Sequence, residues 1–189
     1  MAQEAKRRLT ADDWADAALE ALGERGLTAV AVEPLAARLG ATKGSFYWHF
    51  PNREALVAAT LDRWEQQRTE AVIAEAEVIA DPEQRLRRLL GRVIASAERS
   101  TTEMSLLAHA DHPLVGPVLA RVAERRISYV AKLFGDLGFP PEAARSRALF
   151  AYSAYLGHNQ IAHATPEILP AASAARSYLD QVMTALLAR

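Results

Sequence analysis

The sequence contains no cysteine, which excludes disulfide bonds, thiolate metal sites and thiol-based redox sensing. It also lacks an apolar run long enough to cross a bilayer, and no segment has the pattern of a signal peptide. We therefore expect a cytoplasmic protein without a membrane partner. Its 189 residues, 50% of them hydrophobic, are enough to bury a proper core in one or two domains.

An excess of positive charge, the usual electrostatic mark of a DNA-binding protein, is missing as well. The formal net charge is −1, and residues 1–55 hold seven Lys and Arg against eight Asp and Glu. Positive charge is only local, at Lys6-Arg7-Arg8, Arg38, Lys43 and Arg53. If the chain binds DNA, we expect weak non-specific binding and a reliance on correctly placed contacts. The Lys6-Arg7-Arg8 run is more typical of a solvated tail than of a DNA-binding arm, and both remain open.

The sequence has few signs of an enzyme or a metal site. Neither His109 and His112 nor His158 and His163 are four residues apart, and no Glu-x-x-His or His-Glu-x-x-His motif occurs. A Gly-rich phosphate loop and a nucleophile with an adjacent base are also absent. Asp111-His112-Pro113 is typical of a turn that ends a helix. We predict no catalytic residue, metal or cofactor, and a helical-bundle enzyme or metal-binding protein is the alternative.

Apolar residues recur at helical spacing, and no segment alternates with the two-residue period of a strand. Internal repeats and low-complexity linkers are absent. We predict an all-α fold, with a three-helix domain in residues 1–52 and a helical bundle in residues 53–189. The expected helices cover residues 11–22, 32–39, 43–50, 53–78, 82–94, 100–112, 115–137, 140–163 and 171–188.

Residues 41–53 are the most informative segment of the chain. Thr42 can cap a helix with its hydroxyl, and Phe46 and Phe50 share one face because they are four residues apart. Pro51 stops that helix after about two turns. The remaining positions are cationic, hydroxylated or aromatic: Lys43, Ser45, Tyr47, Trp48 and His49. A short helix held by two phenylalanines, with such a face outward, is typical of one that enters a DNA groove.

The preceding residues predict the first half of a helix-turn-helix. The segment Val32–Leu39 has apolar residues at helical spacing, and Gly40 follows where a left-handed residue normally ends a helix. Helix, turn and the recognition helix Lys43–Phe50 then follow one another in the expected order. Upstream, Thr10 can cap a further helix. That helix has one apolar stripe: Trp14, Ala18 and Leu22.

The stretch from Leu35 to Leu56 resembles the DNA-binding domain of the TetR family of bacterial transcriptional regulators. Turn, aromatic run and following helix start fall in register, and the resemblance covers roughly residues 9–57. The rest of the chain is similar only in length and helical character. The chain departs from the family at Ala31, where Ser or Thr usually caps the second helix, so we expect that helix to begin uncapped. The resemblance implies a transcriptional regulator, by family default a repressor.

We predict that eight residues contact DNA: Thr42, Lys43, Gly44, Ser45, Tyr47, Trp48, His49 and Arg53. Thr42 and the amides of Lys43 and Gly44 lie at a helix N-terminus, where free N–H groups attract a phosphate. Gly44 also permits close approach of the backbone to DNA. Lys43 and Ser45 can reach base edges or phosphates.

The aromatic part of this set has an alternative role. Tyr47 and His49 place polar tips where phosphate contact is expected, and Trp48 can contact a thymine methyl group or a sugar. The resemblance implies the phosphate contact of Tyr47, and it implies that Arg53 holds a phosphate with the start of its own helix. The alternative is that Tyr47, Trp48 and His49 are core aromatics. A helical adaptor without DNA binding is disfavoured by the intact turn and by Lys43 and Tyr47.

The resemblance also implies a homodimer built from the last two helices of each chain. One short helix reads few base pairs, whereas a two-fold pair reads half-sites about one helical turn apart. We therefore expect a homodimer on a near-palindromic double-stranded DNA operator. The candidate interface residues are small or apolar: Ala143, Ala144, Ala148, Leu149, Ala151, Leu156, Ala175, Tyr178, Leu179, Val182, Met183 and Leu186. The alternative is that these faces pack only within the monomer.

A pocket among the middle helices is the second candidate site. Its predicted lining combines apolar walls with a few polar tips: Trp64, Met104, Leu107, His109, Tyr129, Tyr152, Tyr155, His158 and Asn159. Such a lining suits a small, largely hydrophobic effector, whose binding would lower operator affinity by shifting the conformational population. The alternative for each residue is an ordinary place in the core.

Overall fold

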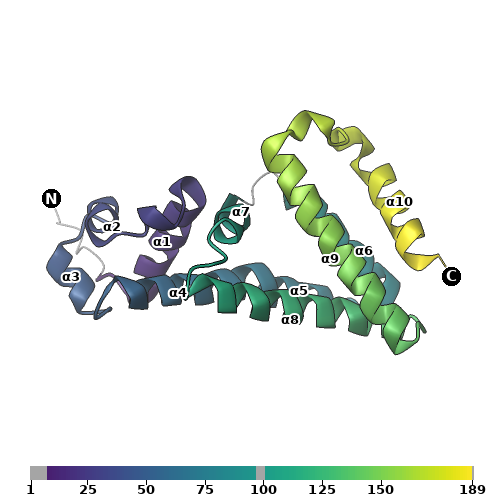
Figure 1. Cartoon of the computed structure of the whole chain (residues 1–189), viewed down its shortest axis with the longest axis horizontal. Coiled ribbons are helices and arrows are strands. Elements are labelled where there is room, and N and C mark those ends of the chain that lie inside the picture. The colour runs from purple at the N-terminus through teal and green to yellow at the C-terminus, as the bar shows by residue number, and fades with distance from the viewer. Residues whose placement is uncertain (1–7, 97–100, 189) are drawn as a thin grey trace, which may run out of the picture.

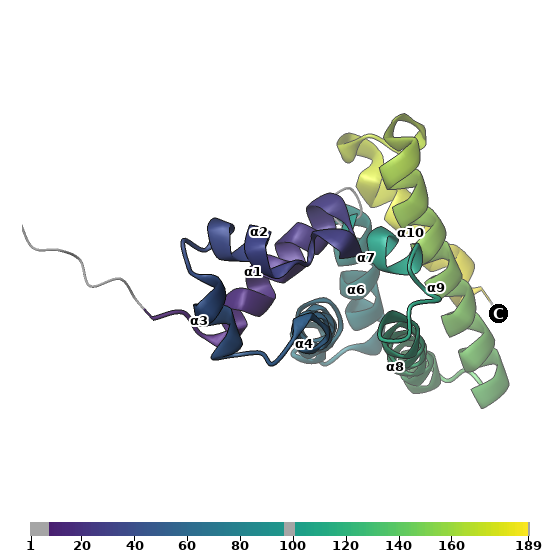
Figure 2. The same ribbon diagram turned by 60° about the vertical axis from the view of Figure 1, so that its left-hand side comes forward.

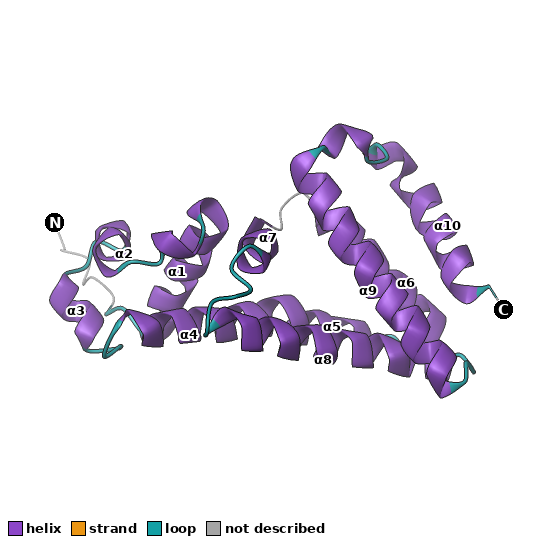
Figure 3. Ribbon diagram, in the orientation of Figure 1, coloured by secondary structure: helices purple, strands orange, loops and turns teal. Residues whose placement is uncertain are grey.

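The structure is a computed structural model that describes residues 8–96 and 101–188. Every element in this part of the chain is helical, which confirms the all-α prediction (Figures 1 and 3). Lys6 and Arg7 of the basic run lie outside the described residues. None of the described helices is long and apolar enough to span a membrane.

The first helix, α1 (Ala11–Arg25), begins at the predicted cap. The Thr10 hydroxyl accepts from the amide of Asp13 at 3.2 Å, and the Asp13 carboxylate accepts from the amide of Thr10 at 2.7 Å. This reciprocal capping box satisfies two amides that helix formation leaves free. Trp14, Ala18 and Leu22 form the predicted buried stripe.

The helix-turn-helix follows the predicted order. A short 3-10 turn, η1 (Leu27–Ala29), leads into α2 (Val32–Arg38), which begins at Ala31 without a side-chain cap, as expected. Gly40 has φ of 58°, the left-handed conformation that ends the helix.

The recognition helix α3 (Lys43–Tyr47) is shorter than the predicted Lys43–Phe50. Its last residues continue as a turn in which the amide of Phe50 donates to the carbonyl of Phe46 at 3.0 Å. Pro51 explains the early end, since proline disfavours a helical conformation for the residue before it.

A long helical rod leaves the three-helix region and runs beneath it toward the far end of the molecule (Figure 1). It consists of α4 (Arg53–Glu65), the π-helical segment η2 (Gln66–Glu70) and α5 (Ala71–Glu77). The sequence predicts one uninterrupted α-helix here, and the π-helical segment is a departure from it. At this point the amide of Ala71 donates five residues back, to the carbonyl of Gln66.

The remaining helices form the bundle, which we define as α5 to α10. They are α6 (Pro82–Ser96), α7 (Thr101–Leu107), α8 (Val115–Asp136), α9 (Pro141–Ala164) and α10 (Ala175–Leu187), with the short turns η4 (Pro166–Ile168) and η5 (Ala172–Ala174) between the last two. The helix predicted to reach residue 112 ends at Leu107 instead. Helices α8 and α9 pack along each other, and α10 packs on α6.

The apolar core has two parts, and the rod contributes to both. The first part joins α1, α2 and α3 to the inner face of α4, and it continues into α7 and α8 through Leu106, Val115 and Val122. The second part lies between α5, α6, α8, α9 and α10. Because α7 also packs on α1, the helix-turn-helix is joined to the bundle at two places, α4 and α7 (Figure 2).

Candidate nucleic-acid interface and internal cavity

The face of α3 that points into the protein is aromatic and buried. Phe46 is completely buried, and its ring meets Trp14 edge-on at 5.4 Å and stacks on Phe50 at 5.6 Å. The opposite face leaves Tyr47 54% exposed and Trp48 81% exposed. Tyr47 and Trp48 are therefore not core residues. Their helix, α3, lies at the end of the molecule farthest from α9 and α10 (Figure 1).

The start of α3 is open to solvent. The Thr42 hydroxyl accepts from the amide of Ser45 at 3.1 Å, so the predicted cap is present. Thr42, Lys43 and Gly44 are all exposed, and a Cβ added to Gly44 would come no closer than 3.7 Å to Thr42. Packing within the chain does not require glycine at this position, which leaves approach by another molecule as a reason for it.

The cations around the turn are paired with acids in the free protein. The Lys43 ammonium lies 3.0 Å from the Glu33 carboxylate, and this hydrogen bond raises the pKa of Lys43. Arg38 makes a bidentate contact with Glu24, at 3.0 and 2.6 Å, and lies 3.3 Å from Glu20. These pairs were not predicted from the sequence, and they reduce the positive charge that this surface presents.

The Arg53 side chain donates hydrogen bonds to backbone carbonyls of its own chain. Its Nε donates to the carbonyl of Val30 at 2.6 Å, and its second nitrogen donates to the carbonyl of Leu27 at 2.9 Å. Asn52 caps α4 by accepting from the amide of Ala55 at 2.8 Å. The guanidinium therefore anchors α4 to the chain before α2, a role different from the phosphate contact that the resemblance implies.

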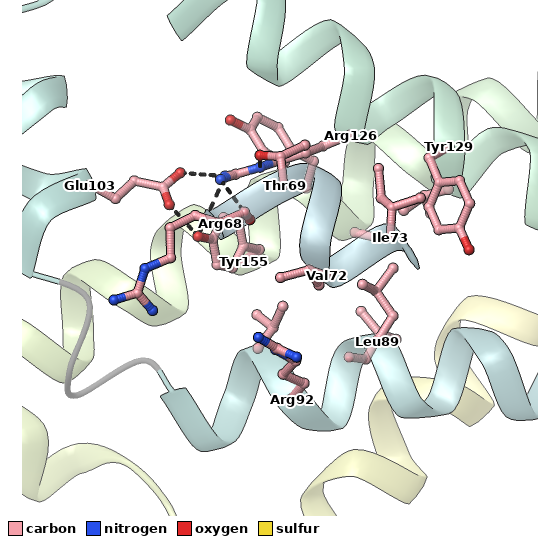
Figure 4. Close-up of a pocket in the computed structure, with 15 residues that line it drawn as sticks. Arg68, Thr69, Val72, Ile73, Leu89, Arg92, Glu103, Arg126, Tyr129 and Tyr155 are labelled. Atoms are coloured by element: carbon pink, nitrogen blue, oxygen red, sulfur yellow. Dashed lines mark hydrogen bonds and ion pairs between the residues drawn. The ribbon is translucent and has the colours of Figure 1, made fainter. Parts of the chain in front are cut away.

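A partly open cavity of about 150 Å³ lies in the bundle, between the rod and helices α6, α8 and α9 (Figure 4). Its walls are mainly aliphatic: Val72, Ile73, Leu89, Leu90, Val93 and Val130. Of the nine residues predicted to line a pocket, Tyr129, Tyr152 and Tyr155 do so.

One end of the cavity is polar and buried (Figure 4). Arg126 donates to Glu103 at 2.6 Å, to the Thr69 hydroxyl at 2.9 Å and to the carbonyl of Arg68 at 3.3 Å. The Tyr155 hydroxyl donates to the other oxygen of Glu103. We call Thr69, Glu103, Arg126 and Tyr155 the Arg126 cluster.

Burial and mutual contact set the charges of the Arg126 cluster. Burial is the largest single influence on Arg126 and opposes its charge, but Glu103, Tyr155 and Tyr152 together more than offset it, and the pKa of Arg126 is raised. Burial, followed by the Glu103 charge, raises the pKa of Tyr155. Arg126 also lies over the rings of Trp64 and Tyr155, at 5.4 and 5.6 Å from their centroids. The cluster thus joins one guanidinium, one carboxylate and one phenol by direct contacts.

The other six predicted pocket residues do not line the cavity: Trp64, Met104, Leu107, His109, His158 and Asn159. Trp64 is buried beneath Arg126, and His109 Nδ1 lies 2.8 Å from the carbonyl oxygen of Ser105 on its own helix. His158 stacks on Tyr178 at 5.7 Å, and burial lowers its pKa against the opposing effect of the Ile94 carbonyl.

Glu103, Arg126, Thr69 and Arg68 are the residues of this site that sequence reasoning missed. Arg126 had a recognisable signal, because it lies four residues after Val122 and four before Val130 on the inward face of α8. A charged residue in such a stripe needs a buried partner. No comparable signal marks Glu103, which resembles an ordinary acid in the first turn of a helix. Within the described part of the chain, no His, Asp and Glu side chains come together as a metal-binding group.

Comparison with known proteins identifies the helix-turn-helix. Residues 15–60 match the family model for bacterial regulatory proteins of the tetR family, a span that runs from α1 into α4. The comparison with curated proteins gives no significant match.

Solved structures match the fold over nearly the whole chain. A transcriptional regulator from Rhodococcus sp. Rha1 has a TM-score of 0.78 over 95% of this chain and 96% of its own, at 20% identity. A structure assigned to the TetR family from Mesorhizobium loti has a TM-score of 0.73 over 94% and 95%, at 22% identity. The multidrug binding protein EbrR, solved in complex with malachite green, has a TM-score of 0.66 over 97% and 98%, at 22% identity.

The helix-turn-helix and the fold together define a DNA-binding transcriptional regulator rather than an enzyme. The enzyme alternative is thereby set aside. Residues 15–60 are thereby identified as a DNA-binding domain of the tetR family type of bacterial regulatory proteins.

Proposed function

We propose that this regulator is a cytoplasmic homodimeric repressor that leaves a near-palindromic operator when a small, largely hydrophobic effector binds. Residues 1–52 read DNA in this proposal, and residues 53–189 dimerise and bind the effector. The observation that carries it is α3, a short helix fixed inward by Phe46 and Phe50 with Tyr47 and Trp48 exposed on its other side. Two adjacent aromatic rings exposed to solvent are typical of a surface that another molecule covers.

The DNA surface consists of the outer face of α3 and the turn before it. Thr42, Lys43, Gly44 and Ser45 approach a phosphate or base edges, and Tyr47, Trp48 and His49 contact the groove wall. The Arg53 guanidinium donates to backbone carbonyls of its own chain, so we assign Arg53 mainly to orienting α4 against this surface.

The outer face of α9 is the proposed dimer contact. Leu149, Phe150 and Ile161 are 53%, 63% and 38% exposed, and a Cβ added at Gly157 would meet nothing within 4 Å. An open apolar face of this kind on a long helix fits a two-fold pairing with its own copy. Among the residues predicted for the interface, Ala144, Ala148, Ala151, Met183 and Leu186 are buried within the monomer. Phe150 was not predicted.

The cavity is the proposed effector site. The similar protein EbrR was solved with the small molecule malachite green, which supports a ligand for this chain as well. The cavity adjoins η2 of the rod that begins under α3, and it adjoins α7, which packs on α1. A ligand that favours another position of either element would change the orientation of α3 and shift the population away from the DNA-binding state.

The test is selection of bound sequences from a random double-stranded DNA pool, with Tyr47→Ala and Lys43→Ala variants beside the parent chain. We expect the parent to enrich a near-palindrome and the variants to enrich it weakly or not at all. Tyr47→Ala should leave the thermal unfolding midpoint nearly unchanged, because its ring is half exposed. Enrichment of the same palindrome by both variants would contradict the proposed reading surface. A monomer at micromolar concentration by light scattering would contradict the dimer.

A further inference from the structure

We propose that the effector is an uncharged molecule of about one aromatic ring, with a single hydrogen-bonding group that meets the Arg126 cluster. This inference rests on the proposed function of the cavity as an effector site. It concerns the chemical class of the effector, which neither the family match nor the similar structures specify.

The charges inside the cavity already neutralise each other. The Arg126 and Glu103 side chains are 13% and 3% exposed, and their charged atoms lie 2.6 Å apart. One carboxylate oxygen of Glu103 accepts from Arg126, and the other accepts from Tyr155. The guanidinium also donates to Thr69 and to the carbonyl of Arg68. Neither charge is left to balance a charged ligand.

Burying a charged ligand group in the cavity would therefore cost binding free energy. An anion that approaches Arg126 meets the Glu103 carboxylate beside it, and a cation that approaches Glu103 meets the guanidinium. Removing a charge from water without a partner is unfavourable, and opening the existing pair exposes one of its members to the same cost. A hydroxyl, carbonyl or amide group avoids both costs, because the Thr69 hydroxyl can donate to it and the Tyr155 oxygen, whose proton is donated to Glu103, can accept from it.

Two further cations, Arg68 and Arg92, line the cavity and support a rival class of ligand, an anionic amphiphile. Arg92 is paired with Glu75, and the Arg68 side chain is exposed. Water and salt screen charges in such positions, so they attract an anion only weakly and do not compensate for burying it further in. The rival places a carboxylate at Arg68 with an apolar tail inside.

The size of the cavity limits the body of the ligand. A volume of about 150 Å³ is that of an apolar cavity able to hold roughly one benzene ring. The aliphatic walls suit such a ring. A larger ligand would have to move a wall or extend into solvent past the exposed Arg68 side chain.

The experiment compares benzyl alcohol, benzoate and benzylammonium, which share a ring and differ in charge. Binding to the full-length chain is measured by calorimetry at neutral pH. We expect benzyl alcohol to bind about tenfold or more tightly than either ion. Equal or tighter binding of an ion overturns the proposal, and loss of benzoate binding in Arg68→Ala would then establish the rival. Failure of all three probes to bind overturns it as well.

Three variants show whether the selectivity comes from the Arg126 cluster. Glu103→Gln leaves the guanidinium without its counter-ion, so benzoate should gain about tenfold relative to benzyl alcohol. Arg126→Gln should shift preference toward benzylammonium instead. If one variant fails to fold by circular dichroism, the other still tests the inference, as does the parent chain. Val72→Phe fills the cavity and should abolish binding of all three probes, and unchanged binding would overturn the site. The DNA selection uses no ligand, so its outcome tests the proposed function independently.

Discussion

The pair of Lys43 with Glu33 on the reading surface and the pair of Arg126 with Glu103 in the cavity use the same chemistry in different surroundings. The first pair has side chains 57% and 76% exposed, and the second has side chains 13% and 3% exposed. An exposed pair contributes little and can exchange its partner for a DNA phosphate. A buried pair cannot open without leaving a charge unpaired. The surface therefore carries charges that a partner can take over, whereas the cavity carries charges that hold α7, α8 and the rod together.

Breaking the buried pair from one side should have the largest effect. Arg126→Met leaves the Glu103 carboxylate buried without its cation, which we expect to lower the free energy of unfolding by about 3–5 kcal/mol. Urea denaturation followed by circular dichroism measures this. The double variant Arg126→Met with Glu103→Leu should recover most of the loss, because no unpaired charge remains. Lys43→Met is the matched control on the exposed pair and should leave the denaturation midpoint unchanged. Equal midpoints for Arg126→Met and Lys43→Met would show that water reaches both pairs.

The two faces of α3 provide a second contrast between buried and exposed groups. Phe46→Ala should cost about 3–5 kcal/mol of stability, the usual loss for a fully buried phenylalanine, because its ring contacts both Trp14 and Phe50. Tyr47→Ala should lose DNA affinity instead. Thermal unfolding and DNA titration on the same preparations separate the effects. A similar loss of stability in both variants would mean that the inner and outer faces of α3 are wrongly assigned.

The region around α3 could be predicted from sequence because its determinants are local. Thr10, Gly40 and Thr42 each act within four residues, and the spacing of Phe46 and Phe50 fixes which face is inward. The cap at Ala31 could be predicted to be absent for the same reason.

The cavity could be predicted only in part because its determinants are distant in sequence. The three tyrosines were predicted because rings with polar tips suit the lining of an effector pocket, but Glu103 and Arg126 are 23 residues apart, and Arg126 meets Thr69 across 57 residues. The apolar stripe of α8 marks Arg126 as inward-facing, but no local pattern identifies its partners. The π-helical segment was missed for a similar reason, since Arg126 contacts a carbonyl and a hydroxyl that this segment presents.

Releasing Lys43 from its exposed ion pair with Glu33 should strengthen DNA binding. In the free protein Glu33 holds the Lys43 ammonium at 3.0 Å, so a phosphate must displace a carboxylate that it also repels. Glu33→Gln removes that competitor, and we expect DNA affinity to rise about two- to fivefold at low salt, with a smaller gain at high salt. Fluorescence anisotropy with labelled operator DNA measures the change. Glu142→Gln, an exposed acid at the start of α9, alters net charge equally and should have little effect. Equal gains from both would assign the effect to net charge alone.

The smallest effect concerns pH and a single buried base in the bundle. His158 stacks on Tyr178, and burial lowers its pKa below the ordinary value of 6.5. Between the folded and unfolded pKa values the unfolded chain binds more protons, so stability is full above about pH 6.5 and falls as pH decreases through the folded pKa. His158→Gln should flatten this dependence in urea denaturation, whereas His163→Gln, an exposed histidine on the same helix, should keep it. If the parent and His158→Gln lose stability in parallel on acidification, another group takes up the proton. Burying a charged His158 would then cost too little free energy to support the contrast between the buried bundle and the exposed reading surface.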